Sequence, residues 1–590
     1  MQRSPSDREK QDPYQQKPED DHDHEQQHGL AYFVPGQVVL LAEHEPNDLP
    51  DSIIDQVKRE LVALKGDQMK HVPKAADSLI AAVDRLHSLW QRKPGVVLTF
   101  KRTNPDANQP GPRWFSQLLI DEVIASDDDH TSDRQLIEAL DFFNRRIITG
   151  RRSSGPLQLS VLSPNWFAAC AQPGITGGPG GQPIAVPEVP VSGVVSALTA
   201  GAETTSINLW QFALPTRIAQ SKVQIKQGYQ DIEVAILDTA PQPAAFKDAG
   251  KHKLHQKHPL LQAMLQPDGM PLEGPPISPA SAGKLSISYA DALQIDLNFP
   301  HPYKINDHRY PMPDHGLFVA GIVNSIAPHA KLHLIEILDS QGVGTLQGLS
   351  QALHMLANRN DINRLVINCS LMINMPLLGH PRKNLDWDAL AEDCELIRRM
   401  SQLVQLIRNE LSVKYGARMH MVAAAGNDAE GGHRPQARLP AALDGVIGVG
   451  AGGPDGGHAE YSNLSDTPLG AGLVTFGGQA HNGRADPTTG MLGVFISPFP
   501  STNGQTQPGA SPHPEANHEP NGWARWAGTS FAAPVISGTL AMLVDKGIAG
   551  DFVEAERLIR EADAVQTTED EEIFMVQQGV ASTTSREMPV

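Results

Sequence analysis

Glu233-Val-Ala-Ile-Leu-Asp238 is a short, almost wholly apolar run that ends in an acid. Further apolar runs follow along the chain, separated by stretches with helical spacing. The runs are 332–338, 365–369, 419–424 and 446–449, and the helical stretches are 346–357 and 390–411. Buried strands that alternate with amphipathic helices are typical of a mainly parallel sheet covered on both faces. Residues 207–563 are therefore predicted to form a doubly wound α/β domain.

Bulk properties narrow the class of protein. A chain of 590 residues exceeds what one hydrophobic core usually serves, and its net charge of −19 argues against nucleic acid or an anionic membrane as the main partner. Three cysteines, Cys170, Cys369 and Cys394, cannot build a disulfide framework, which suits a reducing compartment. The polar N-terminus lacks the apolar core of a signal peptide, and no later stretch has the length of a membrane span. We expect a cytoplasmic protein with no membrane partner.

Composition divides the rest of the chain. Residues 1–29 are too polar to order by themselves, and their run Asp20–His28 is typical of a solvated tail, although it could hold a metal. Residues 31–170 are predicted to form an N-terminal α+β domain, 171–206 a linker rich in glycine and proline, and 564–590 a polar tail. In the α+β domain we expect a strand pair or a bent strand at 32–41, strands at 96–100 and 157–162, and helices at 51–64, 75–90 and 132–148.

Four polar side chains stand at strand ends and helix starts of the predicted sheet. Asp238 ends a strand, His315 begins a helix, Asn427 follows a strand, and Ser530 begins another helix. Each alone has a structural explanation: a turn acid, a packed histidine, a turn asparagine and an N-cap serine. Together they place an acid, an imidazole, an amide and a hydroxyl at the sheet edge where ligands of such folds gather.

This set resembles the subtilase family of serine peptidases, and the resemblance covers about residues 207–548. Asp238 matches the family's Asp-Thr-Gly aspartate, and His315 matches its His-Gly-Thr histidine. Asn427 matches the asparagine of Ala-Gly-Asn, and Ser530 the serine of Gly-Thr-Ser-Met-Ala-Ala-Pro. The resemblance implies a subtilisin-like fold and peptide-bond hydrolysis.

The resemblance also implies a role for each residue. Ser530 is the expected nucleophile, His315 its general base and Asp238 the acid that orients the imidazole, while Asn427 helps to form the oxyanion hole. Ser370 and Leu371 lie in a segment similar to the family's substrate-edge strand, and with Gly426 they are expected to bind the peptide backbone. No metal ligands and no cofactor are expected. A structural calcium ion stays possible, although the sequence does not locate its ligands.

Several positions depart from the family pattern. Ala240 replaces a glycine, so a positive φ there would strain the aspartate loop. Leu317 and Phe318 replace Thr-His and are expected to change the packing around the base, Phe531 replaces methionine, and Met372 replaces a glycine in the substrate groove. Pro534 is expected at the edge of the first turn of its helix.

Two long segments, 247–313 and 477–521, are predicted as loops that either rim the active site or decorate the surface. Asp428 and Glu430 suggest an acidic specificity pocket, although solvated loop acids explain them as well.

The expected activity is that of an endopeptidase acting on intracellular proteins or peptides. Two alternatives stay open: a dedicated peptide-maturation peptidase or macrocyclase, and a scaffold that binds peptide without cutting it. The N-terminal domain is interpreted as a prodomain, which would inhibit the site until cleaved, or as a regulatory module that senses or binds a partner.

Overall fold

The computed structural model describes residues 33–45, 49–66, 73–93, 96–101, 114–123, 129–149, 157–170, 183–186, 210–212, 231–276, 281–298, 311–373, 402–429, 432–453, 457–465, 472–481, 484–499, 521–561, 565–567, 572–574 and 576–578. The predicted tail at residues 1–29 lies outside the described residues, as does Glu430. None of the described helices is long and apolar enough to cross a membrane.

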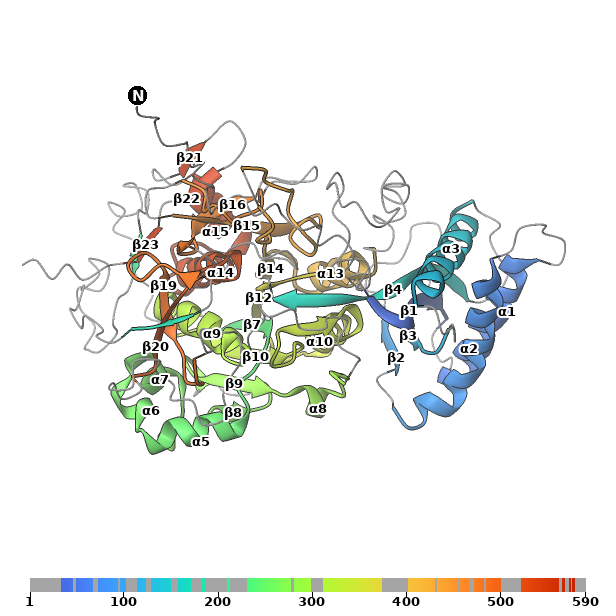
Figure 1. Cartoon of the computed structure of the whole chain (residues 1–590), viewed down its shortest axis with the longest axis horizontal. Coiled ribbons are helices and arrows are strands. Elements are labelled where there is room, and N and C mark those ends of the chain that lie inside the picture. The colour runs from blue at the N-terminus through green and yellow to red at the C-terminus, as the bar shows by residue number, and fades with distance from the viewer. Residues whose placement is uncertain are drawn as a thin grey trace, which may run out of the picture.

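A ten-stranded sheet forms the centre of the larger part of the molecule (Figure 1). Its order is β21 (Val565–Thr567), β22 (Glu572–Phe574), β16 (Leu473–Phe476), β15 (Val446–Gly452), β14 (Met419–Ala424), β12 (Arg364–Cys369), β7 (Ile232–Asp238), β10 (Lys331–Glu336), β9 (Leu285–Ser288) and β8 (Leu272–Glu273). All neighbouring pairs are parallel except β21 with β22. Every residue of β7 is buried, so both faces of the sheet are covered there. The predicted mainly parallel, doubly wound fold is confirmed.

Two buried helices run through this core. α9 (His315–Ile326) and α14 (Thr529–Asp545) pack against each other, and both contact β7. α14 carries a glycine where the two helices meet, because a Cβ at Gly538 would lie 3.0 Å from the Ile326 side chain of α9. Further helices of this part are α10 (Leu346–Asn358), α13 (Gln402–Tyr415), the 3-10 turn η4 (Gly416–Arg418) and α15 (Phe552–Arg560).

The segment between Asp238 and His315 is built of regular structure where it is described. It contains α5 (Pro243–Lys251), α6 (Leu254–Lys257), α7 (Pro259–Met264), β8, β9 and α8 (Ala290–Leu293). Leu254, Leu260 and Leu261 are buried. The prediction of a long loop at 247–313 is therefore wrong for the described part, because helices this short show too few turns to reveal their period.

Seven further strands in the described part of the chain form three small groupings. β5 (Ile184–Ala185) and β19 (Met491–Val494) flank β20 (Trp523–Trp526), β17 (Ala480–His481) pairs with β18 (Arg484–Ala485), and β6 (Trp210–Phe212) pairs with β23 (Val576–Gln578). The predicted linker at 171–206 therefore contributes a strand at its described residues, and the predicted tail at 564–590 contributes β21, β22 and β23. Both predictions missed these strands because each is only two or three residues long.

The N-terminal region is an antiparallel sheet with three helices (Figure 1). The sheet order is β4 (Gln158–Cys170), β1 (Phe33–His44), β3 (Trp114–Ile120) and β2 (Val97–Lys101), and the helices are α1 (Pro50–Lys65), α2 (Lys74–Trp90) and α3 (Asp129–Ile148). The pairing of β1 with β4 shifts register between Phe33 and Val38, next to the left-handed Gly36 (φ 70°). The predicted bent strand is thus one bulged strand. The sequence pattern missed β3 and ended β4 at residue 162.

β4 leaves this sheet and enters the part of the molecule that is built around the ten-stranded sheet, as its long arrow in Figure 1 shows. Its last residues pair antiparallel with β11 (Val343–Thr345) on one side and with β13 (Leu371–Ile373) on the other. Helix α10 supports the junction: Asn165 Oδ1 accepts a hydrogen bond from the backbone N–H of Gln347 at 3.0 Å, and the Gln347 side chain accepts one from Gln117. The two regions are therefore joined by a continuous strand and by buried amides.

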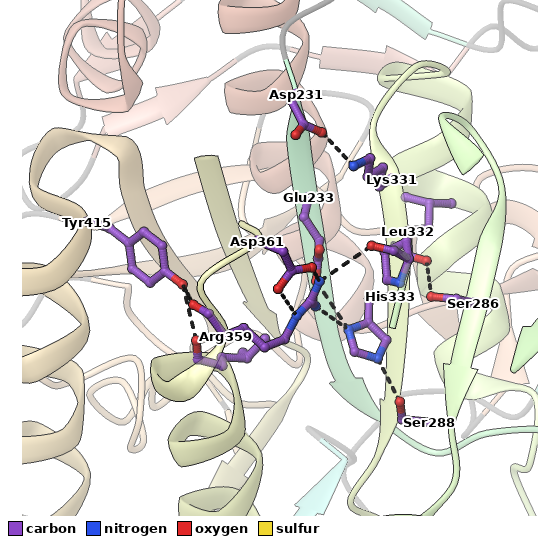
Figure 2. A network of polar contacts seen from close by, with 12 residues as sticks. Asp231, Glu233, Ser286, Ser288, Lys331, Leu332, His333, Arg359, Asp361 and Tyr415 are labelled. Atoms are coloured by element: carbon purple, nitrogen blue, oxygen red, sulfur yellow. Dashed lines mark hydrogen bonds and ion pairs between the residues drawn. The ribbon is translucent and has the colours of Figure 1, made fainter. Parts of the chain in front are cut away.

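A buried polar network closes the opposite end of β7 from Asp238 (Figure 2). Arg359 pairs with Glu233 and, at 2.6 Å, with Asp361, and His333 Nδ1 lies 3.2 Å from the Glu233 carboxylate. Ser288 Oγ lies 2.8 Å from the other ring nitrogen of His333. Because Glu233 is buried, Arg359 is the counter-charge that offsets the cost of burying its carboxylate.

We expect Arg359→Met to lower the free energy of unfolding by about 3–5 kcal/mol, because it leaves the Glu233 carboxylate buried without a counter-charge. Adding Glu233→Gln should recover much of that loss. Urea unfolding measures both variants. Arg557→Met, which removes an exposed ion pair of 2.6 Å with Glu561, is the matched control and should cost less than about 1 kcal/mol. If Arg359→Met and Arg557→Met lower the free energy of unfolding equally, Arg359 is not the essential counter-charge of Glu233.

Candidate active site

Asp238 and His315 form a buried hydrogen-bonded pair. Asp238 is the last residue of β7 and His315 the first of α9, and their Oδ1 and Nδ1 atoms lie 2.7 Å apart. The backbone N–H of Thr239 donates to the same carboxylate oxygen at 2.7 Å. Because Nδ1 faces a carboxylate, the proton of the neutral imidazole resides on Nδ1, and Nε2 is the basic nitrogen. This tautomer suits a general base.

The backbone around the pair needs a glycine at one position and not at another. A Cβ at Gly316 would come within 2.2 Å of the Thr239 carbonyl oxygen, so only glycine fits directly after His315. Ala240 is different: within the described residues, the non-glycine positions with positive φ are Glu122, Lys253 and Gln294. The strain predicted for Ala240 is therefore absent.

Asp314 is a buried acid that the sequence pattern did not single out. Its Oδ2 accepts hydrogen bonds from the backbone N–H groups of Ile496 and Ser497, both at 2.6 Å, and its Oδ1 accepts one from Ser497 Oγ at 2.7 Å. Burial raises the pKa of Asp314, and these hydrogen bonds oppose the rise. Asp314 thus ties the start of α9 to the segment after β19. An acid directly before a helix start was the available signal, but it predicts only a cap.

Ser530 is the second residue of α14, whose N-cap is Gly528. Pro534 lies inside this helix, not at the edge of its first turn, and has no N–H to offer the Ser530 carbonyl. The hydroxyl of Ser370 donates to that carbonyl instead, at 2.6 Å, and Ser530 Oγ donates to the Ser370 carbonyl at 3.2 Å. Asn368 holds Ser370 from behind, with its Nδ2 2.9 Å from Ser370 Oγ. The predicted nucleophile, Ser530, and the predicted substrate edge, Ser370, are therefore joined by direct hydrogen bonds.

Asn427 is oriented by Thr529, the residue before Ser530. Its Oδ1 accepts hydrogen bonds from the Thr529 backbone N–H and hydroxyl, both at 2.9 Å, so the amide nitrogen Nδ2 is its donor. Gly426 has φ 113°, and a Cβ there would lie 2.6 Å from Asn463 Nδ2. The N–H of Gly426 donates to Thr529 Oγ1 and its carbonyl accepts from the Asn463 N–H, so Gly426 shapes the site through its missing side chain.

Aromatic rings enclose one side of the His315 imidazole. Trp526 stands edge-on to it with ring centroids 5.3 Å apart, and the Phe531 ring is 5.1 Å away. Phe318 packs 4.7 Å from Phe531 and 5.6 Å from Trp526. Phe318 and Phe531, which both differ from the family pattern, therefore form part of a packed apolar surface beside the imidazole. Phe531 also connects the start of α14, where Ser530 lies, to His315.

Asp428 does not provide an acidic specificity pocket. Its carboxylate forms a two-point ion pair with Arg438, at 2.6 and 2.8 Å, and accepts a hydrogen bond from Asn463 Nδ2 at 2.9 Å. Both members of the ion pair have side chains less than a tenth exposed. Asp428 thus stabilises the turn after β14. The hypothesis that it forms an acidic specificity pocket is wrong for this residue.

The expected substrate edge is occupied by the chain's own strand β4. Leu371 faces Cys170, Met372 faces Ala169 and Ile373 faces Ala168 in an antiparallel register. On the other side the Cys170 N–H donates to the Gly342 carbonyl at 2.9 Å. The Cys170 thiol ends 4.0 Å from Asp238 Oδ1. β4 therefore fills the groove between β11 and β13 and reaches the Asp238–His315 pair.

A mainly parallel sheet with these residues at its edge defines a subtilisin-like peptidase domain. The chain belongs to the subtilase family, whose family model matches residues 230–568. Comparison with curated proteins finds no match. Among solved structures the chain is similar to a lanthipeptide protease (19% identity, TM-score 0.36, covering 60% of this chain and 88% of that one). It is also similar to the nisin leader peptidase NisP from Lactococcus lactis (16%, 0.33, 60% and 87%) and to a cold-adapted subtilisin-like serine proteinase (14%, 0.31, 58% and 88%).

Ser370→Ala should lower the free energy of unfolding by about 1–3 kcal/mol, because it removes the hydrogen bond to the buried Ser530 carbonyl. Pro534→Ala restores a backbone N–H to that carbonyl, so Ser370→Ala should cost clearly less in the Pro534→Ala background. Denaturant unfolding of the two single variants and the double variant measures this coupling. If the two substitutions have additive effects, the Ser370 hydroxyl does not replace the missing N–H of Pro534 as donor to the Ser530 carbonyl.

Proposed function

We propose that this subtilase-family peptidase is a serine endopeptidase in which Ser530, His315 and Asp238 act as nucleophile, general base and orienting acid. The observation that carries the proposal is the buried Asp238–His315 hydrogen bond, which directs the basic Nε2 away from the carboxylate. The start of α14 lies beside it, joined to the imidazole through Phe531. The sparse cysteines and the negative charge favour intracellular proteins or peptides as substrates, with no nucleic-acid or membrane partner.

The chemistry follows from these positions. As Ser530 Oγ bonds to the substrate carbonyl carbon, its proton passes to His315 Nε2, and Asp238 stabilises the imidazolium that forms. The C–N bond of the tetrahedral intermediate then breaks, and the same proton goes to the leaving amine. Water attacks the acyl-enzyme by the reverse route, giving its proton to His315, and releases the carboxylic acid and the Ser530 hydroxyl.

Two donors serve the oxyanion in this proposal. Asn427 contributes Nδ2, because Thr529 holds its amide oxygen on the other side. Ser530 contributes its backbone N–H from the first turn of α14, where the helix dipole favours negative charge. Both donors are held by hydrogen bonds or helix geometry before substrate arrives, so little reorganisation accompanies the reaction.

In the same proposal, the substrate lies as an extended strand between β11 and β13, and β4 occupies that place in the intact chain. The N-terminal region then inhibits the site in cis until the chain is cut just after β4. β4 ends opposite Leu371, and the next residue of that edge, Ser370, has the carbonyl that accepts from Ser530 Oγ. A cut shortly after Cys170 would release the N-terminal region as a prodomain.

The proposed roles are tested by labelling and by hydrolysis of a peptide library. A fluorophosphonate probe should label the processed wild type and fail to label Ser530→Ala. Asp238→Asn should lower kcat about 10⁴-fold, and Asn427→Ala about 10²- to 10³-fold, since the first disturbs the tautomer and the second removes one oxyanion donor. Folded, processed wild type that takes no label would favour the peptide-binding alternative.

Self-cleavage is tested on the purified full chain. The wild type should yield a new N-terminus within a few residues after Cys170, while Ser530→Ala should stay intact until wild type is added in trans. N-terminal sequencing and intact mass measure both. A chain that is fully active while still full length would exclude inhibition by β4. Product mass also separates hydrolysis from macrocyclisation, because a cyclic product has not gained water.

A further inference from the structure

The thiol of Cys170 lies against the two residues proposed as base and orienting acid. Its Sγ is 4.0 Å from Asp238 Oδ1, and that oxygen is 2.7 Å from His315 Nδ1. One ligand atom from each of the three residues can be chosen so that all lie within 4.8 Å of one another, and all three residues are buried. Cys170 comes from the N-terminal β4, whereas Asp238 and His315 come from the peptidase domain.

The thiol is held in place by a position without a side chain. A Cβ at Gly342 would lie 3.0 Å from Cys170 Sγ and 2.7 Å from Met312 Sδ. The Gly342 carbonyl also accepts the hydrogen bond from the Cys170 N–H. Backbone and side chain of Cys170 are thus both held by the segment that contains Gly342.

A second observation concerns the carboxylate. Oδ2 of Asp238 is buried, and within the described part of the chain it has no hydrogen-bond partner. Oδ1, by contrast, accepts hydrogen bonds from the Thr239 N–H, from His315 Nδ1 and, at 4.0 Å, from the Cys170 thiol. A buried carboxylate oxygen without a partner is costly, and a cation next to it would remove that cost.

The geometry points to a zinc site made of Cys170, Asp238 and His315. We propose that a divalent zinc-like cation binds these three side chains and holds β4 in the groove. Thiolate, imidazole and carboxylate are the ligands that zinc takes in proteins, and three of them leave a fourth tetrahedral position for water. One thiolate and one carboxylate balance the two positive charges, so the buried site is neutral overall.

Binding has a direct chemical consequence for the base. A cation bound at Nδ1 takes the place of the proton in the Asp238–His315 hydrogen bond, and the remaining ring proton then resides on Nε2. Nε2 becomes a donor and can no longer accept a proton from Ser530. The Cys170 thiol also loses its proton to solvent on binding, so affinity should rise with pH. This inference rests on the proposed function for its effect on activity, but not for the binding itself.

The binding test uses full-length Ser530→Ala, in which β4 stays attached, titrated with Co²⁺ as a spectroscopic substitute for zinc. We expect one equivalent of Co²⁺ to produce a thiolate-to-cobalt charge-transfer band, and one equivalent of Zn²⁺ to displace it. Adding Cys170→Ser should abolish the band, while Cys369→Ser and Cys394→Ser in the same background should keep it. Cobalt bound to the histidines of residues 20–28 does not contribute to this band, because that run contains no thiol.

A band that survives Cys170→Ser, or no band in any variant, would overturn the site. Thermal unfolding provides a second readout, since zinc should raise the midpoint of Ser530→Ala and leave Ser530→Ala/Cys170→Ser unchanged. In the wild type, zinc should slow self-cleavage at least about 10-fold, and Cys170→Ser should be insensitive. If Ser530→Ala shows the band and the wild type hydrolyses nothing, the proposed function fails while the metal site stands. If the wild type cleaves itself equally fast with and without zinc, the regulatory part of this inference fails.

Discussion

The carboxylate of Asp238, buried at the end of β7, is the constraint on which the rest of the site depends. An acid in that position is unfavourable unless hydrogen-bond donors surround it, and the chain supplies the Thr239 N–H and the His315 imidazole. The close approach of Gly316 to the Thr239 carbonyl allows α9 to begin at that point. The carboxylate therefore determines both the tautomer of the histidine and the position of the helix that carries it.

The sequence was sufficient for the central sheet and for placing four polar residues at strand ends and helix starts. The apolar strands β7, β12 and β14 were predicted almost to the residue, because parallel strands buried on both faces carry a strong continuous signal. Asp238, His315, Asn427 and Ser530 were found by their places at strand ends and helix starts. Contacts with the backbone or with residues far along the chain leave no pattern in the local sequence. The roles of Asp314, Thr529 and Pro534 depend on such contacts and were therefore not predicted.

The largest omission was the end of β4. Its sequence, Leu162-Ser-Pro-Asn-Trp-Phe-Ala-Ala-Cys170, lacks a clear alternation and contains a proline, so local propensity ends the strand early. The pairing that extends it is made with β11 and β13, which lie about 170 and about 200 residues further along the chain. The same separation hid the thiol: Cys170 and Asp238 are 68 residues apart, and Asp238 and His315 are 77. No spacing rule for metal ligands spans such distances.

Ser370 connects these separate elements into one unit. Its hydroxyl supports the carbonyl that Pro534 leaves without a helical partner, and its carbonyl receives the Ser530 hydroxyl. The strand that begins at the next residue, β13, pairs with β4. The edge that β4 occupies and the helix that carries Ser530 are therefore connected by the hydrogen bonds of a single residue. Under the proposed function Ser530 is the nucleophile, and β4 holds the edge to which its hydroxyl is hydrogen-bonded. β4 pairs with β1, β11 and β13, none of which belongs to the ten-stranded sheet, so under the same proposal its release breaks no pairing within that sheet.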